Sequence, residues 1–180
     1  MSDYQLVRYC APTLAGLKTG SLFTLHFTKE DFRQDITAFN RTMRKKGIRI
    51  IPLKVSDTCA LIYLYRPDML NRDLKDPVAV SILKRFGYSI SSSDRCVVDL
   101  VRRLNSSPVF PHEIGLFLGY PPSDVDGFIN NPNEGFYETG YWKVYSNVES
   151  ARLAFRRFKE CTEEYDRKLK EGRTLEQLVV

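Results

Sequence analysis

The sequence predicts a single mixed α/β domain, residues 1–180, in which a small sheet of about four strands packs with several helices. Two kinds of pattern lead to this prediction. Residues 21–27 alternate apolar and polar side chains as a half-buried strand does, and the runs 48–55 and 59–65 are apolar and partly β-branched. Other segments repeat apolar residues at helical spacing, and the clearest stripe is Phe32, Ile36, Phe39 and Met43.

In the first third of the chain we expect helix before strand. Residues 3–10 are predicted to form a short helix, and Pro12 is expected to begin a further turn that ends at Gly20. The first strand, 21–27, follows. Thr28 then has the residue type of a helix cap, with Asp31 three residues later, ahead of the helix that carries the Phe32 stripe.

The next two strands are expected to form a hairpin, because three residues separate the runs 48–55 and 59–65. The order strand, helix, strand before this hairpin favours a crossover between parallel strands. The second half should be mainly helical, with one more strand at 140–145. The expected helix starts are Pro67, Pro77, Ser93, Pro111, Ser123 and the capping box Ser146–Glu149, and residues 172–180 form a loosely docked tail.

Composition restricts the class of protein. No apolar run approaches the roughly 18 residues that span a bilayer, so no membrane contact is predicted. The N-terminus has no basic region leading into an apolar one, which favours the cytoplasm over secretion. The net charge of +5 comes partly from a cluster near the end of a helix, residues 41–49, where cations complement the helix dipole. A nucleic-acid partner is therefore disfavoured.

The four cysteines, Cys10, Cys59, Cys96 and Cys161, are widely separated in the sequence. They form no C-x-x-C motif and no dense disulfide framework, as expected for a reducing compartment. With only His26 and His112 beside them, no spacing typical of a metal centre occurs, and no metal site is predicted. The sequence also contains no glycine-rich phosphate loop and no G-x-S-x-G motif.

The run FPHEIGLFLGYP, residues 110–121, contains the most site-like residues. Pro111 suits the first position of a helix, and Glu113 would lie in its first turn, where the helix dipole favours a carboxylate. The apolar residues after it predict a short buried helix that ends at Gly119. His112 and Glu113 are candidates for a general acid/base pair. The alternative is a structural pair in which Glu113 serves the dipole and His112 bonds a neighbouring loop.

This run and three other segments resemble a known family. The others are GYWKVY at residues 140–145, residues 10–23, and the helix that bears Cys161. The chain resembles a family of small cytosolic proteins from anaerobic Gram-positive bacteria that is classified as a domain of unknown function. The resemblance covers almost the full chain. It implies a single-domain cytosolic protein and supplies no catalytic residue, ligand or cofactor.

Two further segments are candidates for a site. Cys10 is a candidate nucleophile with His112 as its base, because a helix starting at Pro12 would lower the thiol pKa. The alternative for Cys10 is a packed, inert thiol. In the strand 140–145, Tyr141 and Lys143 are expected to share a face that stacks on a planar anionic ligand, or simply to face solvent. Thr13 and Lys18 complete the candidate ligand-binding residues.

The function that these observations favour is the binding of a small anionic or aromatic metabolite or cofactor, of unidentified kind, in the cytoplasm. The predicted pocket combines residues 10–18, His112 with Glu113, and residues 141–143. Whether a reaction follows binding is left open. The alternative, from a different class, is a non-catalytic adaptor that docks a redox or iron-handling partner protein through its basic and aromatic surface.

Overall fold

The computed structural model of the chain describes residues 1–27 and 32–180. The predicted cap at Thr28 and Asp31 lies outside the described residues. Contacts divide the chain into two compact units: unit 1 comprises Met1–Asp68 and Glu160–Val180, and unit 2 comprises Met69–Lys159. The last long helix, α8 (Val148–Lys170), contributes residues to both units. The expectation of one domain over residues 1–180 stays a prediction.

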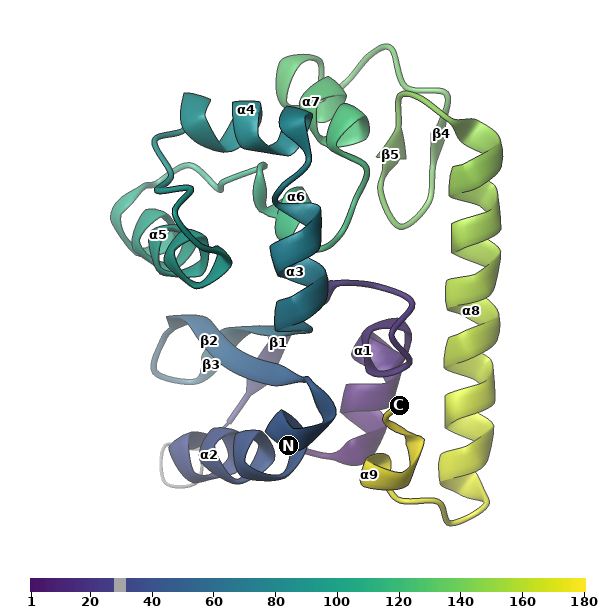
Figure 1. Cartoon of the computed structure of the whole chain (residues 1–180). Helices are drawn as coiled ribbons and strands as arrows, with labels where there is room; N and C mark the ends of the chain where they lie inside the picture. The colour runs from purple at the N-terminus through teal and green to yellow at the C-terminus, as the bar shows by residue number, and fades with distance from the viewer. Residues whose placement is uncertain (28–31) are drawn as a thin grey trace. The chain divides into compact units, whose positions relative to one another are not determined.

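Unit 1 contains a three-stranded antiparallel sheet in the order β1-β3-β2 (Figure 1). Because β3 pairs antiparallel with both neighbours, β1 and β2 run parallel, as the crossover argument predicted, and β3 lies between them. The elements of this unit, besides the end of α8, are α1 (Asp3–Leu14), β1 (Gly20–His26), α2 (Phe32–Met43), the short 3₁₀ turn η1 (Arg44–Lys46), β2 (Arg49–Val55), β3 (Cys59–Tyr65) and α9 (Leu175–Leu178).

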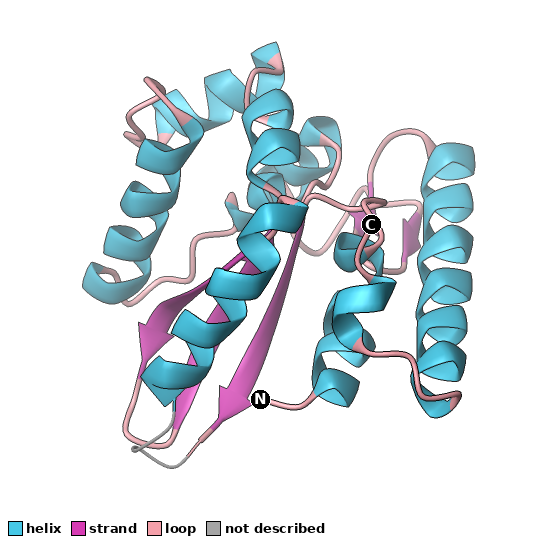
Figure 2. Ribbon diagram, turned by 60° about the horizontal axis from the view of Figure 1, so that its bottom comes forward, coloured by secondary structure: helices cyan, strands magenta, loops and turns pink. Residues whose placement is uncertain are grey.

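One face of this sheet forms the core of unit 1. Phe23 and Leu25 on β1 lie opposite Ile62 and Ala60 on β3, and all four are buried. Helices α1 and α2 pack against this face, α2 lying along the strands (Figure 2). The predicted stripe of α2 does face the core, although only Phe32 and Met43 are fully buried while Ile36 and Phe39 are partly covered.

Helix α1 differs from its prediction, since one helix runs from Asp3 to Leu14 with Pro12 inside it. Two carbonyls of its last turn also accept from a side chain outside the helix. The Arg66 guanidinium donates from Nε to the carbonyl of Thr13 at 2.7 Å and from Nη2 to that of Leu14 at 2.6 Å. Arg66 therefore fixes the point at which the chain leaves α1 for β1.

The C-terminal tail is docked more firmly than expected. Leu175 and Leu178 of α9 are buried in the core of unit 1. The Tyr165 hydroxyl donates to the carbonyl of Leu178 at 2.7 Å, and the Lys46 ammonium donates to that of Val179 at 2.8 Å. Apolar burial and side-chain donors therefore hold residues 175–179 together.

Unit 2 is mainly helical, and it also contains a two-stranded antiparallel sheet, β4-β5, that is separate from the three-stranded sheet. The expected fourth strand at 140–145 is thus wrong in length and in partner: only Lys143 and Val144 are in a strand. The helices and strands of this unit, before α8, are α3 (Pro67–Asp73, from Met69), α4 (Pro77–Arg85), α5 (Ser93–Ser106), α6 (Ile114–Phe117), α7 (Pro122–Asn130), β4 (Glu138–Thr139) and β5 (Lys143–Val144).

The predicted fold class is confirmed, because the chain is a mixture of helices and two small antiparallel sheets. Within residues 1–27 and 32–180, no helix has both the length and the apolar character needed to cross a membrane.

Asn40 should contribute to the stability of unit 1, because its side-chain amide bonds both backbone groups of Ile50 on the edge strand β2. The Ile50 N–H donates to Asn40 Oδ1 at 2.9 Å, and Asn40 Nδ2 donates to the Ile50 carbonyl at 2.8 Å. Asn40→Ala leaves both groups without a partner. We expect it to lower the free energy of unfolding by about 2 kcal/mol in chemical denaturation.

Thr42→Ala on the same helix is the matched control, because the Thr42 hydroxyl bonds only a carbonyl of its own helix. The control should change the free energy of unfolding by less than about 0.5 kcal/mol. Equal effects of the two substitutions would contradict the role assigned to Asn40.

Candidate functional site

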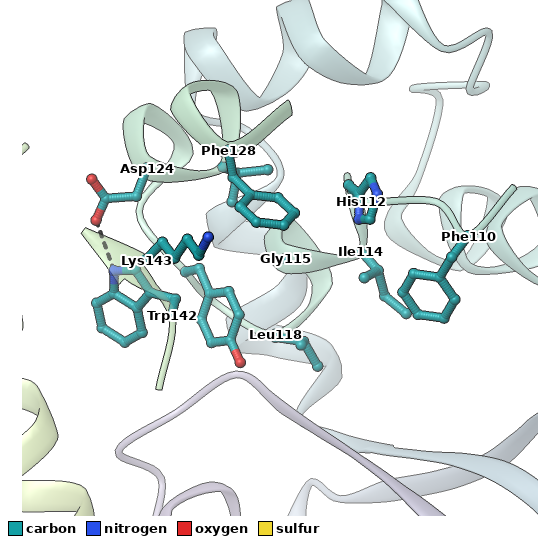
Figure 3. A pocket seen from close by; sticks show the side chains of 11 residues that line it. Phe110, His112, Ile114, Gly115, Leu118, Asp124, Phe128, Trp142 and Lys143 are labelled. Atoms are coloured by element: carbon teal, nitrogen blue, oxygen red, sulfur yellow. Dashed lines mark hydrogen bonds between the residues drawn. The ribbon is translucent and has the colours of Figure 1, made fainter. Parts of the chain in front are cut away.

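Unit 2 contains a cavity of about 210 Å³ (Figure 3). Its walls are mostly aromatic and aliphatic, and the polar side chains around it are few. The residues that line it come from the segment before α6, from α6, from α7 and from the β4-β5 hairpin: Phe110, His112, Ile114, Gly115, Leu118, Tyr120, Asp124, Val125, Phe128, Trp142 and Lys143.

The segment predicted as a helix from Pro111 begins its helix three residues later, at Ile114. Residues 112 and 113 form a turn before it, and Gly119 ends the segment with a φ of 75°, which glycine adopts readily. Gly115 lies where α6 meets α7. A Cβ on Gly115 would be 2.8 Å from the Val125 side chain and 3.2 Å from the Tyr120 ring. The absence of a side chain there lets these two pocket residues approach the backbone.

Asp124 joins α7 to the β4-β5 hairpin. The residue is 2 % exposed. Oδ2 accepts a hydrogen bond from the indole Nε1 of Trp142 at 2.7 Å, which is the dashed line in Figure 3. Oδ1 accepts from the Tyr145 backbone N–H at 2.9 Å and from the Ser146 hydroxyl at 2.7 Å. Both oxygens of the acid are thus used inside the protein, and they fix the Trp142 wall of the pocket.

These bonds also account for two failed predictions. The Tyr145 N–H donates to Asp124, so it is not available to extend the β4-β5 ladder beyond Val144. Ser146 was expected to cap α8, but its hydroxyl bonds Asp124, and the cap is Asn147, whose Oδ1 accepts from the Ser150 N–H at 3.0 Å.

Two glycines allow close packing around the same hairpin. A Cβ on Gly127 of α7 would lie 2.4 Å from the Tyr145 ring, and one on Gly140 would lie 2.2 Å from the Phe155 ring. Real Cβ atoms do not approach other atoms this closely. The hairpin can therefore rest against α7 and α8 only because both positions lack a side chain.

His112 and Glu113 point to different surroundings. The His112 imidazole lies at the pocket, edge-on to the Phe128 ring with the centroids 5.1 Å apart. Its ring nitrogens make no hydrogen bond to any described residue. Glu113 does not line the pocket, and its side chain is 1 % exposed. Only His112 of the two therefore lines the pocket, and the hypothesis of an acid/base pair stays a prediction.

Glu113 instead belongs to a buried polar cluster with Arg103 of α5 and with Tyr88, which precedes α5. Its Oε1 accepts from the Tyr88 hydroxyl at 3.0 Å and lies 2.8 Å from Arg103 Nε. Arg103 also donates to the Phe86 carbonyl at 3.0 Å. Burial and the neighbouring Glu113 carboxylate raise the pKa of Tyr88, so its phenol keeps its proton. The cluster holds the turn at 112–113 in place and leaves His112 facing the cavity.

Lys143 extends into the pocket from β5 (Figure 3). Its ammonium donates to the Pro132 carbonyl at 2.6 Å and lies 4.4 Å from the Phe136 ring centroid and 5.7 Å from that of Phe128. It forms an ion pair with no carboxylate of the described residues. The carbonyl and the two aromatic faces do not carry a formal negative charge, so the Lys143 charge is not neutralised within that part of the chain.

Tyr141 does not line the pocket. Its ring packs against Phe155 and Phe158 of α8, with centroids 5.7 and 5.3 Å away. Trp142 and Lys143 both line the pocket. The expected alternation of residues 141–145 is therefore wrong, because those before Lys143 are in a turn, where side chains do not alternate as they do in a strand.

The other candidates, Cys10, Thr13 and Lys18, belong to unit 1. The Thr13 hydroxyl is buried and hydrogen-bonded to that of Ser21 at 2.9 Å. Burial raises the pKa of the Cys10 thiol to about 12, although the Lys18 charge opposes the rise. The predicted lowering is wrong, because Cys10 lies well inside α1 and is not near a helix start at Pro12. Its pairing with His112 stays a prediction.

Burial also lowers the pKa of the Lys18 ammonium, to about 8, and the nearby Cys10 opposes this shift. All four cysteines are free thiols, as expected. The described part of the chain contains no group of histidines, cysteines and carboxylates arranged to hold a metal ion.

Sequence reasoning identified His112 and Lys143 at the pocket and missed the residues that shape it. Asp124, Phe128 and Tyr120 were not chosen as site residues. Asp124 has the sequence signature of an ordinary acid in the first turn of a helix. Its bonds to residues about twenty positions away have no local pattern that identifies them.

Fold and site together define a mixed α/β protein with a small, largely apolar pocket that carries one lysine and one histidine. The chain belongs to the family described as "Protein of unknown function (DUF3793)", whose model matches residues 6–179. No curated protein and no solved structure matches the chain.

The first prediction for the site concerns Asp124. In Asp124→Asn an amide nitrogen replaces a carboxylate oxygen, so three donors compete for one acceptor oxygen. We expect a loss of about 2–4 kcal/mol in the free energy of unfolding. The fluorescence of Trp142, the only tryptophan of the chain, should also shift as its indole becomes more mobile.

Asp126→Asn is the matched control, because Asp126 lies on the same helix and pairs with Arg85 at a solvent-exposed position. The control should cost less than about 1 kcal/mol and leave the fluorescence unchanged. If Asp124→Asn behaves like the control, Asp124 does not fix the pocket wall.

The second prediction concerns Lys18. Its pKa is about 8 in the folded protein and returns to about 10.5 on unfolding, so below pH 8 the folded state carries the full cost of a buried charge. That cost falls between pH 8 and 10.5 and is absent above. Lys18→Met should raise the melting temperature most below pH 8, and this gain should vanish by about pH 10.5. A gain independent of pH would contradict the assignment.

Proposed function

We propose that the protein is a cytoplasmic small-molecule binding protein and that the unit 2 pocket holds a small anionic or aromatic metabolite. The single observation that carries the proposal is the chemistry of the pocket walls. An otherwise apolar cavity contains the Lys143 ammonium, which pairs with no carboxylate of the described residues, and the His112 ring, which bonds none of them. Apolar walls with a few polar groups are typical of ligand sites.

Lys143 is only partly buried, and a bound anion would supply the opposite charge that the described residues do not give it. Lys143 keeps part of its hydration and its contact with the Pro132 carbonyl, which makes the ligand-free state tolerable. The four free cysteines support the cytoplasmic assignment, since disulfides are rare in that compartment.

The proposed site is smaller than the pocket predicted from the sequence. It uses His112 and Lys143, and it does not need Thr13, Lys18 or Tyr141. No reaction forms part of it, because Glu113, the partner considered for His112, is engaged by Tyr88 and Arg103. The adaptor hypothesis stays a prediction.

The experiment uses the indole N–H of Trp142, which gives the only tryptophan side-chain signal of ¹⁵N-labelled protein. Mixtures of small carboxylates, phosphates, neutral aromatic compounds and aliphatic amines are added to the full chain. We expect members of the anionic or aromatic groups to move this signal, and Lys143→Met to weaken the effect of the anions.

Lys84→Met is the matched control, because Lys84 is an exposed lysine of α4 that does not line the pocket. It should bind the same compounds as the parent protein. The proposal fails if no mixture moves the Trp142 signal, or if only the aliphatic amines do.

A further inference from the structure

The charge of the pocket restricts the ligand further. Lys143 and Asp124 are its two lining residues that carry a formal charge. Asp124 directs both oxygens at protein donors and is almost fully buried, so it presents no free acceptor to a ligand. An ammonium has three N–H donors, and the Pro132 carbonyl takes one from Lys143. Within the described chain the pocket therefore offers positive charge and unused donors.

The size of the cavity restricts the ligand as well. A volume of about 210 Å³ exceeds the roughly 150 Å³ that accommodates benzene in an engineered protein cavity. It is below the range of about 300–1,000 Å³ that is usual for drug-sized ligands. One six-membered ring with a small substituent fits within this volume, whereas a base, a sugar and a phosphate together would extend beyond it.

The walls favour a planar ring. Phe128, Tyr120 and Trp142 surround the cavity, and Trp142 cannot turn away because Asp124 holds its indole nitrogen. Aromatic rings pack well against one another when offset or edge-on. His112 already adopts the edge-on arrangement against Phe128. An aromatic ring in the cavity would meet these three aromatic neighbours, of which Trp142 is held in advance by Asp124.

Between the two common small anions, a carboxylate suits this site better than a phosphate. Phosphates in proteins are usually bound by several donors, such as a guanidinium fork or a row of backbone N–H groups. Here the Lys143 ammonium is available, whereas the His112 imidazole lies across the Phe128 ring from it (Figure 3). A single cationic donor suits a carboxylate, in which two oxygens share one negative charge.

From these observations, and resting on the proposed function, we infer that the unit 2 pocket selects single-ring aromatic carboxylates, with the ring among Phe128, Tyr120 and Trp142 and the carboxylate on Lys143. Recognition combines a charge-assisted hydrogen bond with ring packing, and both are needed for selectivity.

Four probes separate these contributions, with the fluorescence of Trp142 as the readout on the full chain. They are benzoate, the neutral isostere benzamide, the non-aromatic cyclohexanecarboxylate, and inorganic phosphate. We expect benzoate to bind at least about tenfold more tightly than each of the other three, a difference of about 1.4 kcal/mol. Lys143→Met should remove this preference for benzoate over benzamide by weakening benzoate binding more than benzamide binding, and Lys84→Met should preserve it.

Each other outcome has a distinct meaning. Benzamide or cyclohexanecarboxylate binding as tightly as benzoate would overturn the inference and leave the proposed binding site standing. Phosphate binding more tightly than benzoate would replace the carboxylate by a phosphate and overturn the inference in the same way. If none of the four probes changes the Trp142 signal of a folded protein and no mixture moves its indole resonance, the proposed function fails as well.

Discussion

Asp124 accepts three hydrogen bonds from the segment 142–146, and the geometry of the pocket follows from this buried carboxylate. Trp142 is held as a wall because its indole nitrogen has a fixed partner. The bond to the Tyr145 N–H keeps that group from extending the β4-β5 ladder, which ends at Val144. Gly127 is required beside it, because any side chain there would collide with the Tyr145 ring.

The hydrogen bonds of Asp124 also determine which charge the pocket presents to a ligand. Asp124 lines the pocket and is the acid that could serve as a counter-ion for Lys143. Its two oxygens, however, accept hydrogen bonds from Trp142, Tyr145 and Ser146. Glu113 is likewise bound by Tyr88 and Arg103, away from the cavity. Two acids thus stabilise the frame while the lysine and the histidine face an apolar space. An arrangement of this kind favours a ligand that brings both a negative charge and apolar surface.

Local signals predicted much of this fold. The strand at 59–65 and the helix starts at Pro67 and Pro77 agree with the structure, because alternation and proline act within a few residues. His112 and Lys143, which were chosen as candidates from their chemistry, both line the unit 2 pocket. What was missed depends on contacts between distant residues: Asp124 looks like an ordinary first-turn acid, and Ser146 looks like a helix cap. The expected strand at 140–145 failed for the same reason, since a bond to α7 ends it.

The most direct test of a preorganised, anion-accepting pocket is a crystal structure of the full chain with 4-bromobenzoate, whose bromine is located by its anomalous signal. The account predicts bromine between Phe128 and Trp142, the carboxylate on Lys143, and the Trp142–Asp124 hydrogen bond unchanged. Bromobenzoate bound only outside the pocket, or inside it with the carboxylate directed away from Lys143, would contradict the account.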